Sequence, residues 1–139
     1  KHRLEYIGMV KGWRLFDDLA ATTPEATLKA LESFQDAATV IMGGDHKKLS
    51  YADLARVIVE RRIKLICLPG TVRKELKMIR GLEKRSENFF QVKTLDAALC
   101  LANKITPRGG VVLISPGGEK FYSRFMANQG LKSWIEAAH

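Results

Sequence analysis

Two adjacent carboxylates, Asp17 and Asp18, stand between the apolar stretch 13–16 and a Thr-Thr-Pro-Glu sequence at 22–25. The first threonine as N-cap would put the glutamate at N3 of a capping box, whereas the second would put the proline at N1. Either cap leaves free backbone amides at a helix start, and these attract anions. The pattern therefore predicts a strand-to-helix turn that handles both phosphate and cationic groups.

Two further polar loops follow apolar runs. The run 38–42 leads into Gly-Gly-Asp-His-Lys-Lys at 43–48, and the run 111–114 leads into Ser-Pro-Gly-Gly at 115–118. Short continuous apolar runs are typical of strands that are buried on both faces. Because the carboxyl ends of parallel strands meet at one edge of a sheet, we expect all three loops to share one rim.

Apolar runs alternate with amphipathic stretches along most of the chain. The pattern predicts strands at 4–10, 13–16, 38–42, 63–68, 89–92 and 111–114, and helices at 24–33, 50–62 and 72–82 and from 95 onward. Ser50 is expected to cap the second helix, and the segment 119–139 to be partly helical. The expected fold is α/β: a Rossmann-like three-layer domain with a mostly parallel sheet of about six strands and an N-terminal antiparallel hairpin.

Composition indicates an ordinary globular domain. The chain has 139 residues, 46% of them hydrophobic, and a net charge of +8. No apolar run approaches the roughly 20 residues of a membrane span, and no signal peptide is recognisable, so a cytoplasmic location is expected. Cys67 and Cys100 lie among apolar residues and are expected to be reduced core residues. The start at Lys1, without a methionine, suggests a piece of a larger protein.

Most of the excess positive charge falls between residues 56 and 85, which carry ten Lys or Arg against three Glu. No aromatic residues alternate with these charges, and most of them fall on the outer faces of two expected helices. We interpret them as solvated surface. The alternative is a free-standing binding module that uses this surface for nucleic acid or an acidic protein.

Four blocks of sequence carry a resemblance to a known family. They are His2-Arg3-Leu4-Glu5, the first loop at 17–23, Gly43-Gly44-Asp45-His46-Lys47, and Ser115-Pro116. In order and spacing they resemble the C-terminal domain of the Mur ligases, in particular of the members that add D-glutamate to UDP-N-acetylmuramoyl-L-alanine. The chain lacks the P-loop pattern GxxxxGK[ST], so the domains for ATP hydrolysis and the UDP-sugar would lie elsewhere in a larger enzyme.

The resemblance implies an ATP-driven, Mg²⁺-dependent amide synthesis through an acyl phosphate, in a cytoplasmic enzyme of peptidoglycan synthesis. No catalytic residue is expected in this domain alone. The resemblance assigns nucleotide binding to three residues and amino-acid binding to four: His2, Arg3 and Asp18 for the nucleotide, and Thr22, Lys47, Ser115 and Lys120 for the amino acid. The amino acid is expected to be D-glutamate, and the isolated domain to be inactive.

The chain departs from the family pattern at positions that would bind the amino-acid substrate. The family's first-loop lysine is Ala20 here, and its serine is Leu19. Lys120 could supply the missing positive charge. A related ligase that adds a different amino acid therefore stays open as an alternative. His46 lies beside Asp45, but no second histidine is near, so no metal site is expected.

Overall fold

Six strands form a single sheet in the order β1-β2-β6-β3-β4-β5. The computed structural model describes residues 2–46, 48–82, 84, 87–126 and 130–138. The strands are β1 (Glu5–Val10), β2 (Trp13–Asp17), β3 (Ala37–Met42), β4 (Lys64–Cys67), β5 (Phe89–Gln91) and β6 (Val111–Ile114). β1 and β2 form an antiparallel hairpin, and the other neighbouring strands pair in parallel. The predicted fold class is confirmed.

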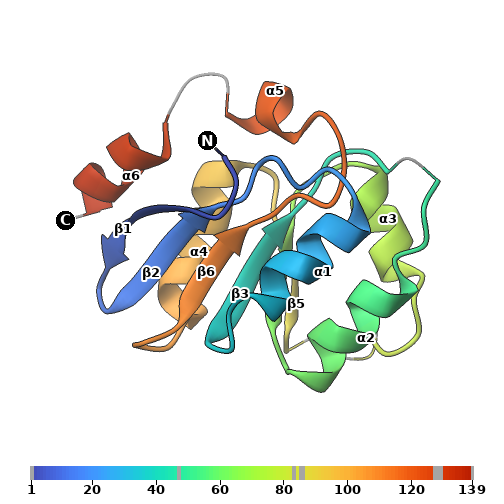
Figure 1. Ribbon diagram of the computed structural model, residues 1–139. Helices are drawn as coiled ribbons and strands as arrows, with labels where there is room; N and C mark the ends of the chain where they lie inside the picture. Colours follow the sequence, from blue (N-terminus) through green and yellow to red (C-terminus); the bar gives the residue numbers. More distant parts are fainter. Residues whose placement is uncertain (1, 47, 83, 85–86, 127–129, 139) are drawn as a thin grey trace.

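Helices cover both faces of this sheet (Figure 1). They are α1 (Pro24–Glu32), α2 (Ala52–Glu60), α3 (Thr71–Lys77), α4 (Leu95–Ile105), α5 (Phe121–Phe125) and α6 (Leu131–Ala138). One hydrophobic core holds residues of α1, α2 and α3, and the other holds residues of α4, α5 and α6. The loops after the parallel strands β2, β6 and β3 lie at one edge of the sheet.

Alternation along the buried strands explains their uninterrupted apolar runs. In β6, Val111 and Leu113 belong to the core under α1–α3, whereas Val112 and Ile114 belong to the core on the α4 side. Successive side chains of a strand point to opposite faces, and here both faces are covered by helices. All four positions of β6 are therefore apolar.

Thr23 is the N-cap of α1: its hydroxyl accepts a hydrogen bond from the amide of Ala26 at 3.2 Å. Pro24 therefore occupies N1, as the second of the two predicted arrangements required. The prediction that Ser50 caps α2 was wrong, because the N-cap residue is Tyr51. The Ser50 hydroxyl accepts a hydrogen bond from the Ala52 amide.

Two other predictions were wrong in position. α3 ends at Lys77, short of the expected residue 82. Cys67 is buried as expected, but Cys100 is exposed. The buried face of α4 consists of Leu95, Ala98, Leu99 and Ala102. Because a helix has 3.6 residues per turn, Cys100, which directly follows Leu99, lies on the exposed face.

Among the described residues, no helix is both long and apolar enough to cross a bilayer.

Candidate functional site

The carboxyl ends of β2, β6 and β3 lie side by side in the sheet, so the three polar loops meet at one edge. The Gly117 amide donates to the Ala21 carbonyl at 2.9 Å, which joins the last loop to the first. Asp45 and Glu119 exchange two backbone hydrogen bonds of 2.9 and 2.8 Å, which join the last loop to the middle one. The predicted common rim is confirmed.

Asp18 is held at this rim by groups from three distant segments. Its carboxylate accepts hydrogen bonds from the Ser115 hydroxyl at 2.7 Å and from the Leu4 amide at 3.3 Å. The Thr27 hydroxyl on α1 lies 3.0 Å from the Ser115 hydroxyl and donates to the Ser115 carbonyl at 3.2 Å. Asp18, Thr27 and Ser115 are all buried, so this network fixes one orientation of the carboxylate.

Opposing effects act on the Asp18 carboxyl. Burial raises its pKa above the ordinary value, and this effect outweighs the hydrogen bonds from Ser115 and Leu4 and the nearby Arg3, which lower the pKa. The neighbouring Asp17 carboxylate raises it further. An acidic group with a raised pKa in a concave site is typical of functional sites.

Beside Asp18 lies a groove of about 330 Å³ between the N-terminal residues and α1. Arg3 and Asp18 line it together with Lys29 of α1. The structure thus brings together two of the three residues predicted to bind nucleotide, and it adds a second cation from α1.

Residues 2–4, here called the N-terminal strap, lie against the first loop. The His2 carbonyl accepts a hydrogen bond from the Ala20 amide at 2.8 Å, and the Leu4 amide donates to Asp18. His2 and Leu4 adopt positive φ angles of 61° and 47°, which are uncommon for residues other than glycine. The strap therefore has a defined conformation over the loop.

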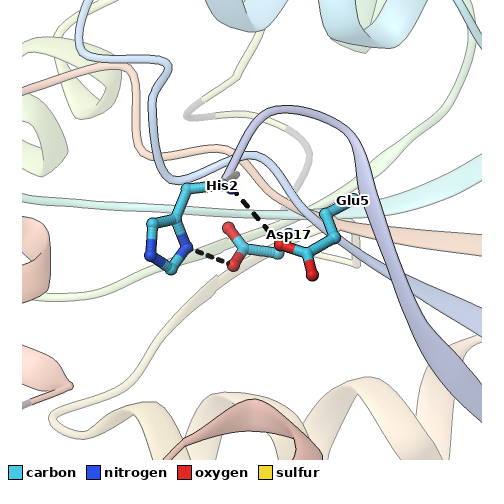
Figure 2. Close-up of side chains that lie close together, drawn as sticks. All are labelled: His2, Glu5 and Asp17. Carbon is cyan, nitrogen blue, oxygen red and sulfur yellow. Dashed lines mark hydrogen bonds and ion pairs between the residues drawn. The ribbon is translucent and has the colours of Figure 1, made fainter.

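The His2 imidazole, the third predicted nucleotide ligand, contacts Asp17. Its Nδ1 lies 2.6 Å from Oδ2 of Asp17, and Glu5 accepts a hydrogen bond from the His2 amide at 3.3 Å (Figure 2). Asp17 is only 3% exposed, and its other oxygen accepts from the Leu19 amide at 2.9 Å. The sequence did not predict that these three side chains converge.

Asp45 organises the middle loop. Its carboxylate accepts two hydrogen bonds from the Arg124 guanidinium, at 3.1 and 2.6 Å, and one from the Thr71 amide at 3.2 Å. The Lys120 ammonium lies 3.9 Å away. The hydrogen bonds from Arg124 are the main reason that the pKa of Asp45 falls to about 2.

Thr22 is half-buried directly before the cap of α1. Ser115 is fully buried, and Lys120 is exposed at the rim. Lys47 lies outside the described residues. Thr27 and Arg124 were missed by the sequence reasoning: a threonine inside a helix and an arginine in an aromatic segment give no signal of the loops they contact.

Two of the basic residues between 56 and 85 have structural contacts. Arg61 donates to the Leu31 and Phe34 carbonyls at the end of α1, at 2.7 and 2.6 Å, and Arg73 donates to the Val92 carbonyl at 3.4 Å. These side chains cap neighbouring segments. These two arginines therefore contribute to the fold, whereas the sequence predicted solvated surface.

Comparison with curated proteins gives many relatives, among them ligases that are named for D-glutamate. The UDP-N-acetylmuramoylalanine–D-glutamate ligase of Thermosipho melanesiensis is 33% identical over 121 residues, which cover 86% of this chain and 27% of that protein. The enzyme of the same name from Bdellovibrio bacteriovorus is 35% identical over 120 residues, covering 86% and 25%. The chain belongs to the Mur ligase family. It spans about a quarter of the length of these relatives, and no family model matches it.

One Mur ligase relative carries a different substrate in its name. The UDP-N-acetylmuramoyl-L-alanine–L-glutamate ligase of Micromonospora sp. is 36% identical over 126 residues, covering 89% of this chain and 27% of that protein.

Solved Mur ligase structures share the fold. MurF from Acinetobacter baumannii matches with a TM-score of 0.64 at 19% identity, covering 91% of this chain and 30% of that one. The MurF ligase of Thermotoga maritima in complex with ADP matches with a TM-score of 0.60 at 15% identity, covering 99% and 32%. The six-stranded sheet with its antiparallel N-terminal pair is thus that of a Mur ligase C-terminal domain.

Proposed function

We propose that this chain is the C-terminal domain of a larger ATP-dependent ligase that joins glutamate to UDP-N-acetylmuramoyl-L-alanine, a precursor of peptidoglycan. The observation that carries the proposal is the rim contact between Asp18 and Ser115, which holds a carboxylate beside a groove with two cations. The names of the relatives supply the reaction class.

The groove is proposed to receive the nucleotide. Arg3 and Lys29 place two cations in it beside the acidic Asp18 and Glu25, and a guanidinium fork suits the oxygens of a phosphate. Asp18 supplies an acceptor that is already oriented for a nucleotide hydroxyl or amino group. Because the His2 side chain contacts Asp17, we propose that His2 acts by positioning the N-terminal strap.

We propose that the amino acid binds at the same rim. Thr22 at the start of α1 and Lys47 in the middle loop would bind its carboxylates. Lys120 would supply the cation that Ala20 does not provide. The buried hydroxyl of Ser115 already donates to Asp18, so its proposed role is to position the loop between the two ligands.

The chemistry divides between this domain and the rest of the enzyme. ATP, accompanied by Mg²⁺ held outside this chain, transfers its γ-phosphoryl group to the alanine carboxylate, and ADP leaves. The glutamate amine, after losing a proton, then attacks the acyl carbon, and inorganic phosphate leaves as the amide forms. This domain contributes no catalytic residue to these steps. It orients the amine against the acyl phosphate, which removes much of the entropic cost of the encounter.

Three parts of the proposal extend beyond this chain. The UDP-sugar and ATPase domains of the parent enzyme are its proposed partners. The proposed location is the cytoplasm, where the nucleotide substrates are made. The isolated domain is expected to be inactive.

The test uses the full-length protein that contains this chain. Phosphate release is measured with ATP, Mg²⁺ and UDP-N-acetylmuramoyl-L-alanine, and with D-glutamate, L-glutamate, lysine or diaminopimelate as the amine. The proposal expects release that depends on glutamate, and the preferred enantiomer decides between the two kinds of curated relative. Release with lysine or diaminopimelate alone would overturn glutamate as the substrate. An absence of release with every amine would overturn the ligase assignment.

A further inference from the structure

We propose that His2, Glu5 and Asp17 form a binding site for a transition-metal dication, with Zn²⁺ as the natural ion. The three ligand atoms, one imidazole nitrogen and two carboxylate oxygens, all lie within 4.8 Å of one another (Figure 2). The Mg²⁺ required by the proposed ligase reaction is a separate ion, and the site stands on its own geometry.

The two carboxylates face each other for a reason built into the sheet. Glu5 and Asp17 are direct partners in the antiparallel pairing of β1 with β2. Like charges at directly opposed positions of a strand pair destabilise the pairing. A dication between them would convert this repulsion into two attractive contacts.

The ligands are also oriented before any ion binds. One oxygen of Asp17 is occupied by the Leu19 amide, which leaves Oδ2 directed toward the His2 ring. The Tyr122 ring packs edge-on against that imidazole with 5.7 Å between ring centroids and limits its rotation. Asp17 is buried and His2 and Glu5 are half-buried, so an ion here would be partly shielded from water.

The local charge balance favours a cation. The carboxylates of Glu5, Asp17 and Asp18 gather at the end of β2, and Arg3 is the positive neighbour that acts on Asp18. Arg3 offsets one of these three negative charges, and a dication between Glu5 and Asp17 would offset the other two.

The donor set selects the kind of ion. One imidazole nitrogen with two carboxylate oxygens matches the ligands of Zn²⁺ and Co²⁺. Mg²⁺ requires a nearly octahedral shell of oxygens and keeps much of its water, so a site with imidazole disfavours it. Three protein ligands also leave a coordination position for water.

A bound ion would tie the N-terminal strap to the end of β2. Because the strap also carries Arg3 and the Leu4 amide that contacts Asp18, the ion would stabilise the wall of the groove. We therefore expect Zn²⁺ to raise the unfolding temperature of the chain.

The test is Co²⁺ titration of the metal-free 139-residue chain, followed by its visible absorption. The terminal amine is acetylated, Cys100 is changed to Ser because its thiol is exposed, and residue 139, a third histidine, is changed to Ala. We expect one Co²⁺ per chain, displaced by Zn²⁺ and not by Mg²⁺. His2→Ala and Glu5→Gln should each weaken binding at least about tenfold, while circular dichroism shows both variants folded.

His46→Ala is the matched control. His46 also faces one carboxylate, that of Glu75 at 3.6 Å, but it has no second acidic partner in the clusters formed by the described residues. Unchanged binding in this variant supports the site. The proposal is overturned if the chain with His2, Glu5 and Asp17 intact gives no Co²⁺ spectrum, or if Mg²⁺ displaces Co²⁺ as well as Zn²⁺ does. It is also overturned if the folded His2→Ala variant binds Co²⁺ as tightly as the His46→Ala control.

Discussion

The hydroxyl of Ser115 lies 2.7 Å from the carboxylate of Asp18, although 97 positions separate the two residues in sequence. Thr27 of α1 completes the contact, so the loops after β2 and β6 and the helix between them act as one unit. The orientation of Asp18 therefore depends on residues that need not touch any ligand themselves.

Replacing Ser115 by alanine should leave a buried carboxylate without its best donor. We expect the free energy of unfolding to fall by about 1–3 kcal/mol, measured by urea denaturation. Ser123→Ala is the control, because the Ser123 hydroxyl donates to the Lys120 carbonyl at an exposed position. Equal stability of the two variants would contradict the structural role of Ser115.

Gly44 should tolerate no side chain. Its φ is +91°, and an added Cβ would lie 2.2 Å from the Glu119 carbonyl oxygen, in the pairing that joins two of the loops. Gly109 has a similar φ of +83°, but nothing lies within 4 Å of its added Cβ. Gly109→Ala should therefore cost only the conformational penalty, about 1–2 kcal/mol, and Gly44→Ala clearly more, as judged by thermal unfolding. Comparable losses in both variants would show that the loop pairing contributes little.

The ion pair of Asp45 with Arg124 should stabilise the fold only above strongly acidic pH. The pKa of Asp45 is lowered from 3.8 to about 2 in the folded chain, so its contribution is complete above about pH 4 and is lost as pH falls toward 2. Because both groups are partly exposed, we expect this contribution to be small. Asp45→Asn should flatten the acid limb of the unfolding curve, whereas Asp53→Asn, at an exposed position of α2, should leave it unchanged.

Tyr51 should make the fold sensitive to alkali. Its hydroxyl donates to the Gly117 carbonyl at 2.5 Å, and burial raises its pKa from 10.0 to about 12. The unfolded chain ionises first, so stability should fall as pH rises from about 10 to about 12. Tyr51→Phe should be less stable at neutral pH, having lost the hydrogen bond, but should lose less on going to high pH. The slope of unfolding temperature against pH checks this, and identical slopes would refute it.

The strands of the sheet were well predicted from the sequence, because a buried strand packs one face against each of the two hydrophobic cores. Val111 to Ile114 is a run of four apolar residues for this reason. Helix ends were less predictable. α3 stops at Lys77 although its apolar periodicity continues, and the threonine that caps α1 was one of two equal candidates.

The candidate site was predictable in its loops and not in its contacts. Spacing alone placed Asp18 and Ser115 at one rim. The sequence indicated Asp45 only as part of the block at 43–47 and as a neighbour of His46, yet its side chain binds Arg124, which lies 79 positions away on α5. Such pairs depend on how a short helix packs over the sheet, and no local sequence pattern encodes that arrangement.

The central claim is that Asp18 holds the nucleotide in a ligase. Its most direct test is the kcat/KM for ATP of the full-length protein with UDP-N-acetylmuramoyl-L-alanine and the preferred glutamate enantiomer, comparing the natural protein with Asp18→Asn. The amide keeps the shape and an oxygen acceptor for Ser115 but removes the charge, so we predict a loss of roughly ten- to a hundredfold for ATP, with the KM for glutamate little changed. An unchanged kcat/KM for ATP in the folded variant would contradict the account.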